Sequence, residues 1–326
     1  MPRAPGFWRE DGAVARLLAP LGGLYGALAA RQLRRPAPRA ALPTIVVGGL
    51  TTGGDGKTPL VIALAEILAA MGDRPALLTR GYGARARGRT PFVVRCDDSV
   101  EETGDEARLL ARHGLTIVGA DRAASAELAR QMGATALILD DGFHSRHLAP
   151  DFAALAIDAE YGAGNGRCIP AGPLRAPLQA QLDAADALVL IGEGAAGASL
   201  AEVKPSFKAA IVTEEKKFSG ERVVAFAGIG RPEKFFSTLT AGGAEIVARR
   251  AFADHRRFSA DEIAELAALS RRHGAKLVTT EKDAVRLAPA ALDVETLPIR
   301  LVFADENSVA AALAAALEAA RLSRAS

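Results

Sequence analysis

The sequence has few cysteines and little net charge, and each shortage excludes a class of protein. It also contains no internal repeat. Cys96 and Cys168 are its only cysteines. They form neither a zinc-binding spacing nor a disulfide framework, so we expect a protein of the reducing cytoplasm. The formal net charge of the 326 residues is only +2, which argues against bulk binding to nucleic acid. At this length the chain is expected to form two domains rather than one.

The N-terminal segment combines basic charge with a short apolar run. Residues 1–40 hold seven arginines and two acidic residues, whereas residues 17–30 carry no charge. That run is shorter than the roughly 20 apolar residues that a spanning helix needs, and three arginines follow it, whereas a secretory signal has its basic residues in front. Leucines at helical spacing with flanking arginines predict a helix lying in the headgroup region of a membrane. An ordinary helix packed on its own domain is the alternative.

Beyond residue 42 the sequence alternates short β-rich apolar runs with helical patterns. This alternation predicts parallel strands joined by crossover helices. A polar segment then separates two α/β regions. The predicted organisation is an N-terminal membrane-surface helix over 1–40, a first domain over 41–203, a linker over 204–222 and a second α/β domain over 223–326.

A glycine-rich loop stands between the first expected strand, 44–47, and a helical pattern. It consists of Thr51, Thr52, Gly53, Gly54, Asp55, Gly56, Lys57 and Thr58. Such a loop directs backbone N–H groups and the positive end of a helix at phosphates, with Lys57 on the β- and γ-phosphates and the Thr58 hydroxyl on Mg²⁺. The strict pattern has glycine at position 51, where this chain has Thr51. A glycine-rich turn that binds no nucleotide is the alternative. The expected fold class is the P-loop NTPase-type α/β fold, a parallel sheet sandwiched by helices with a second, smaller α/β lobe.

Acidic residues follow another expected strand. The apolar run 136–139 leads directly into Asp140 and Asp141. An acid at the end of a strand downstream of a phosphate loop is the usual place for a Mg²⁺ ligand. The alternative is a plain turn, because Asp-Gly is common in turns.

Two further polar positions are candidates for catalysis. Asp105 and Glu106 open an expected helix, where acids can cap the helix or supply a general base. His255 lies in a charged loop ahead of Ser259 and Glu262, which are spaced as a helix-capping box. A lone histidine in a loop is most often only solvated.

Together the motifs resemble the tetraacyldisaccharide 4′-kinase family, also called lipid A 4′-kinases. The matching stretches run from the N-terminal helix to Arg286, and Thr51 itself agrees with the family's loop. They are the phosphate loop with residues 47–49, and residues 78–83, 104–106, 118–122, 139–143, 164–167, 170–175, 227–232, 254–255 and 280–283.

The resemblance implies ATP and Mg²⁺ as cosubstrates. It implies that the acceptor is the 4′-hydroxyl of a tetraacylated glucosamine disaccharide 1-phosphate, a glycolipid, and that the product is lipid IVA. It places the enzyme on the cytoplasmic face of the bacterial inner membrane, with no nucleic-acid partner. It also implies that Asp105 acts as the base on the hydroxyl, supported by His255, while Lys57 and Mg²⁺ supply most of the positioning and charge neutralisation.

The chain departs from the family pattern at several positions. His144 and Ser145 stand where the family usually has Gln and His, Ala176 replaces a usual Glu, and Ala107 replaces a usual Pro. No substrate or metal role is assigned to these positions. Two other classes of function are compatible with the phosphate loop: a regulatory NTPase switch that docks on membranes, and a non-catalytic membrane-associated nucleotide-binding module.

Overall fold

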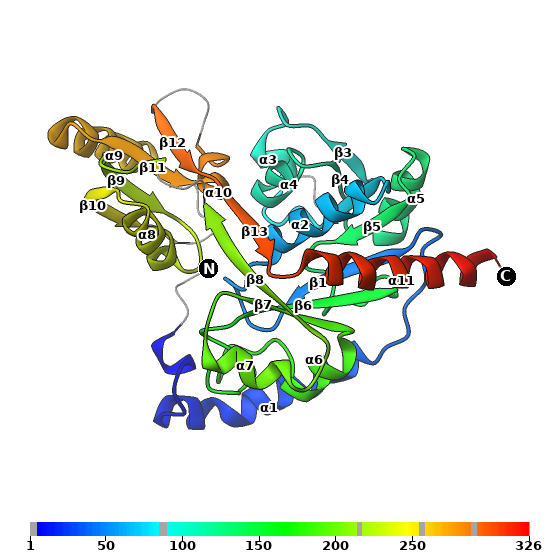
Figure 1. Cartoon of the computed structure of the whole chain (residues 1–326). Coiled ribbons are helices and arrows are strands. Elements are labelled where there is room, and N and C mark those ends of the chain that lie inside the picture. The colour runs from blue at the N-terminus through cyan, green and yellow to red at the C-terminus, as the bar shows by residue number, and fades with distance from the viewer. Residues whose placement is uncertain (1–4, 85–89, 214–216, 254–257, 288–291, 326) are drawn as a thin grey trace.

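The computed structural model describes residues 5–84, 90–213, 217–253, 258–287 and 292–325. It contains two β-sheets, one nine-stranded in the order β13-β8-β7-β6-β1-β5-β2-β4-β3 and one four-stranded in the order β10-β9-β11-β12. We call the parts built on them the large lobe and the small lobe (Figure 1). The predicted fold class, an α/β protein with a mostly parallel sheet, a smaller α/β lobe and an N-terminal helix, is confirmed.

The large sheet is parallel except at β3 and β13. Strand β1 lies in its middle, between β5 and β6. Side chains alternate between the two faces, with Ile45 and Val47 in one apolar core and Val46 in the other. Burial of both faces explains the near-continuous apolar runs of these strands. The strands are β1 (Thr44–Gly49), β2 (Pro75–Thr79), β3 (Phe92–Val94), β4 (Leu115–Val118), β5 (Ala136–Leu139), β6 (Phe152–Asp158), β7 (Ala187–Ile191), β8 (Ser206–Thr213) and β13 (Ile299–Phe303).

Helices cover both faces of this sheet. Apolar residues of α2 and α11, such as Leu64 and Leu313, fill one core, and residues of α5 and α6, such as Ala129 and Leu182, fill the other. The parallel order places the carboxyl ends of β1 and β5 side by side. The helices are α2 (Lys57–Ala70), α3 (Val100–Thr103), α4 (Asp105–Leu110), α5 (Arg122–Gln131), α6 (Leu178–Ala184), α7 (Ala195–Ala201) and α11 (Glu306–Ala325).

The small lobe is a parallel sheet with helices packed on it. Phe235 and Phe236 of α8 enter one apolar cluster, and Leu266 of α9 enters another. The predicted capping box of Ser259 and Glu262 is present at the start of α9. The elements are β9 (Arg222–Ala227), α8 (Pro232–Ala241), β10 (Glu245–Ala251), α9 (Ala260–His273), β11 (Lys276–Thr280), α10 (Glu281–Ala284) and β12 (Val294–Leu297).

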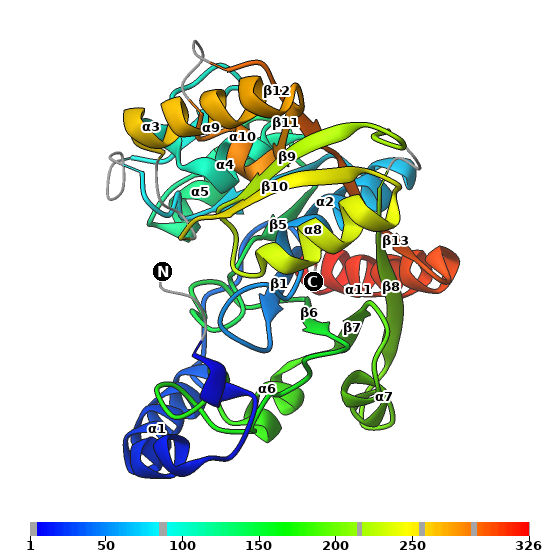
Figure 2. The same ribbon diagram turned by 90° about the vertical axis from the view of Figure 1, so that its left-hand side faces the viewer.

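The connection between the lobes differs from the prediction. The expected linker over 204–222 contains β8, which pairs antiparallel with β13. The chain therefore returns to the large lobe after the small one, and α11 buries Leu313 and Leu317 in the large-lobe core. Most side chains of β8 are exposed or only half-buried, so the strand lacks the buried apolar run of the central strands. Figures 1 and 2 show β8 and β13 running between the lobes.

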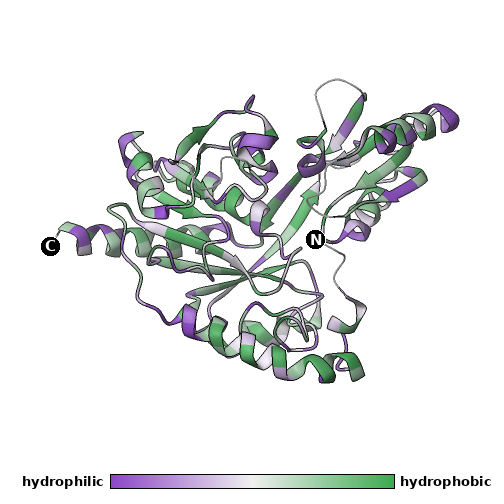
Figure 3. Cartoon of the chain, turned by 180° about the vertical axis from the view of Figure 1, so that it is seen from behind, coloured by the Kyte–Doolittle hydropathy of each residue, from purple (hydrophilic) through white to green (hydrophobic). Residues whose placement is uncertain are grey.

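The N-terminal helix α1 (Ala13–Leu33) lies along the outside of the large lobe, after a short 3-10 helix, η1 (Gly6–Trp8). Its 21 residues are long and apolar enough to cross a membrane by length and composition alone. One side of α1 packs closely on the protein, since a Cβ at Gly26 would lie 2.9 Å from the Sγ of Cys168. The other side is an exposed apolar stripe. Figure 3, where α1 runs along the lower edge, shows that most of this helix is hydrophobic.

Candidate active site

The phosphate loop follows the carboxyl end of β1 and enters α2 at Lys57. Gly53, Gly54 and Gly56 have φ angles of 89°, 78° and 80°, a conformation that side chains with a Cβ rarely adopt. Among the described residues, no side chain caps the start of α2. The first N–H groups of this helix therefore remain available to an anion.

Asp55 folds back inside this loop and is buried. Its Oδ2 accepts the N–H of Thr51 at 2.8 Å, and its Oδ1 accepts the Thr51 hydroxyl at 2.6 Å. Burial raises the pKa of Asp55, while the charge of Lys57 opposes that rise. The threonine that replaces glycine at position 51 thus has a structural function, because its hydroxyl holds the loop closed on Asp55.

Asp140 follows β5 and lies at the same edge of the sheet as the phosphate loop. Asp140 is buried, with only 3% of its surface exposed. Burial, together with the negative charges of Glu106 and Asp141, raises the pKa of Asp140 to about 7. Its carboxylate is thus crowded by other acids, which a bound cation would relieve.

Asp141 lies in a different environment from its neighbour. Arg175 donates to both of its carboxylate oxygens, with Nη2 2.9 Å from Oδ2. Burial acts to raise the pKa of Asp141, but the hydrogen bonds and charge of Arg175 outweigh it and hold that pKa well below its usual range. Two adjacent acids are therefore tuned in opposite directions.

Arg175 belongs to a Gly/Pro-rich loop that packs on the phosphate loop. The N–H of Thr52 donates to the carbonyl of Pro173 at 3.0 Å. Thr51 pairs with Leu174 through an isolated antiparallel β-bridge. The same loop contacts the N-terminal helix, because a Cβ at Gly22 would lie 2.7 Å from the carbonyl oxygen of Cys168. One loop thus connects α1, the phosphate loop and Asp141.

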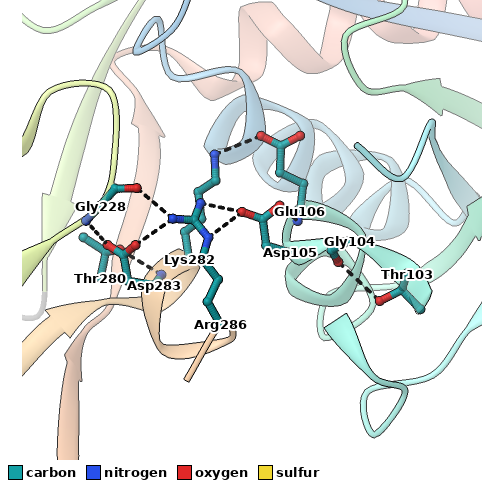
Figure 4. Close-up of polar contacts among 9 residues, drawn as sticks. All are labelled: Thr103, Gly104, Asp105, Glu106, Gly228, Thr280, Lys282, Asp283 and Arg286. Atoms are coloured by element: carbon teal, nitrogen blue, oxygen red, sulfur yellow. Dashed lines mark hydrogen bonds and ion pairs between the residues drawn. The ribbon is translucent and has the colours of Figure 1, made fainter. Parts of the chain in front are cut away.

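Asp105 is the first residue of α4 and faces the small lobe. Its Oδ2 accepts two hydrogen bonds from Arg286, which follows α10, with the Nε donor at 2.7 Å (Figure 4). Beside this pair, Nζ of Lys282 lies 3.1 Å from Oε1 of Glu106. The predicted partner of Asp105, His255, lies outside the described residues.

A second contact joins the small lobe to the phosphate-loop side of the large lobe. Asp158, at the end of β6, is buried and forms ion pairs with Arg231 and Lys234. The guanidinium carbon of Arg231 lies 4.2 Å from the ring centroid of Tyr161. A Cβ at Gly54 would lie 3.1 Å from Nε of Arg231, so Arg231 lies directly over the loop.

The chain as a whole is similar to known proteins. The sequence model of a family described as tetraacyldisaccharide-1-P 4′-kinase matches residues 14–318. The chain belongs to this family. The tetraacyldisaccharide 4′-kinase of Methylobacterium nodulans is 49% identical over 316 residues, covering 94% of this chain and 93% of that protein. That of Nitrobacter winogradskyi is 43% identical over 322 residues, covering 94% and 95%.

A solved structure agrees with the family assignment. The crystal structure of LpxK from Aquifex aeolicus in complex with ATP matches with a TM-score of 0.72 and 27% identity, over 93% of this chain and 99% of that chain. The predicted family and kinase activity are therefore confirmed. The ATP in that structure agrees with the predicted cosubstrate.

Two departures from the family pattern, His144 and Ala176, meet at Gln181 beside the residue that precedes the phosphate loop. The Nε2 atom of His144 lies 2.8 Å from Oε1 of Gln181, whose amide donates to the carbonyls of Leu50 and Ala176. Burial and the nearby charge of Arg175 lower the pKa of His144 to about 4, so the imidazole is neutral near pH 7. Ala107 is fully buried in α4.

Another buried cation of this site, Arg122, has no predicted role from the sequence. Its Nη1 donates to the carbonyl of Gly119 at 3.3 Å, whereas Nε and Nη2 have no hydrogen-bond partner among the described residues. Burial and the charge of Arg80 lower the pKa of Arg122 to about 10, and Asp140 opposes this. Its only signal in the sequence was its place in a matching motif, because burial of an arginine is not readable from spacing.

Proposed function

We propose that this chain transfers the γ-phosphate of ATP to the 4′-hydroxyl of tetraacyldisaccharide 1-phosphate, giving lipid IVA. The observation that carries the proposal is the meeting of three elements at one edge of the large sheet. These are the phosphate loop after β1, Asp140 after β5 and the start of α4 with Asp105. At that start, Gly104 lies against the residues that follow β2, and the charge of Glu106 acts on Asp140. Phosphoryl transfer needs a phosphate cradle, a metal ligand and a group near the attacking hydroxyl.

ATP binding is assigned to the loop from Thr51 to Thr58. The positive φ angles of its glycines and the uncapped start of α2 suit it to the triphosphate. Lys57 would neutralise the β- and γ-phosphates as charge moves between them. The buried pair of Thr51 and Asp55 keeps the loop in this shape before nucleotide binds.

Thr58 and Asp140 are the residues that would hold Mg²⁺. The donor set fits, because a hydroxyl and a buried carboxylate crowded by Glu106 and Asp141 offer hard oxygen ligands. Asp141 is engaged by Arg175, so we assign it to the outer shell, where it orients Asp140 and water. No cluster of three or more His, Cys, Asp or Glu side chains suited to a metal occurs in the described part of the chain, which suits an ion that shares its ligands with phosphate. When bound, Mg²⁺ would supply charge neutralisation to the transferring phosphoryl group.

Asp105 is the proposed base. As the 4′-hydroxyl attacks, its proton would pass to the Asp105 carboxylate, with His255 in the supporting role that the family resemblance implies. The buried guanidinium of Arg122, close to Asp140, is suited to anionic phosphate oxygens.

The acceptor is a lipid, and α1 is the proposed contact with the membrane. Leu17, Leu21, Leu24 and Leu28 are 57% to 80% exposed on one side of the helix. Exposed arginines flank this stripe at Arg16 and beyond the end of α1, as in helices that lie on anionic lipid surfaces. We therefore place the enzyme on the cytoplasmic face of the inner membrane, where ATP is available.

ATP consumption in detergent micelles, with and without the glycolipid acceptor, tests this function. The kinase proposal predicts ATP turnover that depends on the acceptor and disappears in Lys57→Ala. Equal turnover without acceptor would instead identify a regulatory NTPase. Nucleotide binding with no turnover in either condition would identify a non-catalytic module.

A further inference from the structure

We propose that Arg286 is a positioning residue for the reaction, which fixes the carboxylate of Asp105 from across the lobe boundary. The inference rests on the proposed function, in which Asp105 accepts the proton of the attacking hydroxyl. It adds that this base is held by the small lobe, so its orientation depends on the two lobes being together.

The geometry of the pair is that of a bound and oriented carboxylate. Nε and Nη2 of Arg286 both donate to Oδ2 of Asp105. The side chains of Asp105 and Arg286 are only 7% and 3% exposed. Hydrogen bonds between charged groups are strong and directional when water is excluded, so this contact fixes the rotation of the carboxylate.

Arg286 is itself held in place by its own lobe. Its remaining nitrogen, Nη1, donates to the carbonyl of Gly228 at 2.7 Å and to Oδ1 of Asp283 at 2.9 Å. Asp283 is fully buried, and its Oδ2 accepts the Gly228 N–H at 2.9 Å and the Thr280 hydroxyl at 2.7 Å. Figure 4 shows this chain of contacts running from the ends of β9 and β11 to Asp105. The guanidinium is therefore a fixed reference point and not a mobile surface cation.

The contact also suits the chemistry of a base. A neighbouring guanidinium favours the ionised carboxylate, which is the form that accepts a proton. Because Arg286 donates to Oδ2, Oδ1 is left to other partners, among them the N–H of Glu106 at 3.0 Å. Small errors in the placement of a reacting group can cost about 100-fold in rate. An Asp105 carboxylate held in one orientation should therefore support a measurably higher kcat than a freely rotating one.

A double-mutant cycle tests the proposal in the full-length enzyme, with ATP and the glycolipid acceptor in detergent micelles. The variants are Arg286→Met, Arg286→Lys, Asp105→Ala and the double variant of Arg286→Met with Asp105→Ala. The control is Lys234→Met, which removes an ion pair between the same two lobes at Asp158 and leaves Asp105 and Arg286 unchanged. Melting curves and binding of a fluorescent ATP analogue report folding and nucleotide affinity.

We expect Arg286→Met to lower kcat by about 30- to 100-fold with little change in KM for ATP. Arg286→Lys should recover part of the loss, because lysine keeps the charge but lacks the two-pronged geometry. The double variant should be no slower than Asp105→Ala alone, since a residue that acts through Asp105 has nothing left to position. Lys234→Met should stay within about twofold of the natural enzyme, because Arg231 still forms its ion pair with the buried Asp158.

The outcomes separate this inference from the proposed function. Full kcat in Asp105→Ala would remove the base role itself, whatever Arg286 does. Loss of kcat in Asp105→Ala, with Arg286→Met as active as the Lys234→Met control, would overturn only the positioning role. If the kcat losses of Arg286→Met and Asp105→Ala multiply in the double variant, the positioning role of Arg286 is overturned too. If Arg286→Met does not fold, Arg286→Lys decides, and kcat equal to that of the control would contradict the proposal.

Discussion

Thr51 and Asp55 form a closed pair inside the phosphate loop, in which both the backbone N–H and the hydroxyl of the threonine donate to the same carboxylate. Asp55 is 1% exposed, so its oxygens depend on these two donors and not on water. The pair shapes the loop from within and leaves its outward-facing N–H groups to phosphate. Thr51, at a position where the strict loop pattern has glycine, therefore helps to hold the loop in shape.

The first prediction concerns this pair. Thr51→Val keeps the shape of the side chain but removes the hydroxyl, which leaves a buried carboxylate oxygen short of a donor at a cost of about 1 to 3 kcal/mol. We expect KM for ATP to rise about tenfold, measured by steady-state kinetics. Thr51→Ser retains the hydroxyl and is the matched control. Equal KM values in the two variants would show that the hydroxyl does not hold the loop.

The second prediction follows from the raised pKa of Asp140. Below its pKa of about 7 the nucleotide-free enzyme carries this side chain protonated, which cannot ligate a cation well. The concentration of Mg²⁺ needed for half-maximal nucleotide binding should therefore fall as the pH rises through 7. Titrations with Mg²⁺ below and above pH 7 measure this dependence. Asp140→Asn should need a high Mg²⁺ concentration at both pH values. A flat dependence in the natural enzyme would remove Asp140 as a direct ligand.

The same group gives a stability prediction of definite sign. The pKa of Asp140 is higher in the folded state than its ordinary value of 3.8, so the folded state binds more protons than the unfolded state between these values. The contribution of Asp140 to the free energy of unfolding therefore falls as the pH rises from about 4 to about 7. Melting curves without Mg²⁺ should show less of this fall in Asp140→Asn than in the natural enzyme. Identical pH profiles would contradict the assignment.

The third prediction concerns Arg175. Arg175→Met removes both donors to Asp141 and leaves a half-buried carboxylate without its arginine partner beside Asp140. We expect the pKa of Asp141 to rise, because the hydrogen bonds and charge of Arg175 are what keep it low. Leaving this half-buried carboxylate without its arginine partner should destabilise the fold, which lowers the melting temperature. Asp141→Asn in the same background should restore part of the stability; no recovery would mean that the loss comes from packing of the loop.

The fourth prediction separates the two sides of α1. Replacing Leu17, Leu21, Leu24 and Leu28 with Gln should weaken binding to vesicles containing an anionic lipid by at least about 100-fold, since each buried leucine contributes about 1.5 kcal/mol or more. Sedimentation with vesicles measures the partitioning, and the melting temperature should stay nearly constant. Gly26→Val faces the protein, where its Cβ would lie 2.9 Å from the Sγ of Cys168, and should destabilise the fold instead. Unchanged partitioning of the leucine variant would remove the membrane role of the exposed stripe.

The sequence was sufficient for the features that depend on local pattern. The parallel strands of the large lobe are buried on both faces, and their continuous apolar runs made them visible. The phosphate loop and the capping box at Ser259 depend on neighbouring residues, so their spacing was enough. The segment of β8 falls inside the predicted linker, because the charged run that follows it marks the region as polar, and its pairing with β13 is set by contacts far apart in the chain.

The ion pairs of the site were not predictable in this way. Arg175 is 34 residues from Asp141, and Arg286 is 181 residues from Asp105. Arg175 lies in a motif that matches the family, and Arg286 lies at the end of the matching stretches, but no local pattern indicates which acid each one meets. Only the three-dimensional arrangement of the two lobes brings Asp105 and Arg286 together. The predicted role of His255 stays a prediction.

The central claim is that this enzyme moves phosphate from ATP to a glycolipid hydroxyl. Its most direct test follows radiolabelled γ-phosphate from ATP into the lipid fraction, with purified full-length enzyme, Mg²⁺ and tetraacyldisaccharide 1-phosphate in micelles. The account predicts a labelled lipid that carries one phosphate more than the acceptor, formed by the natural enzyme and not by Lys57→Ala. Release of all the label as free phosphate, at a rate that is the same without acceptor, would contradict it.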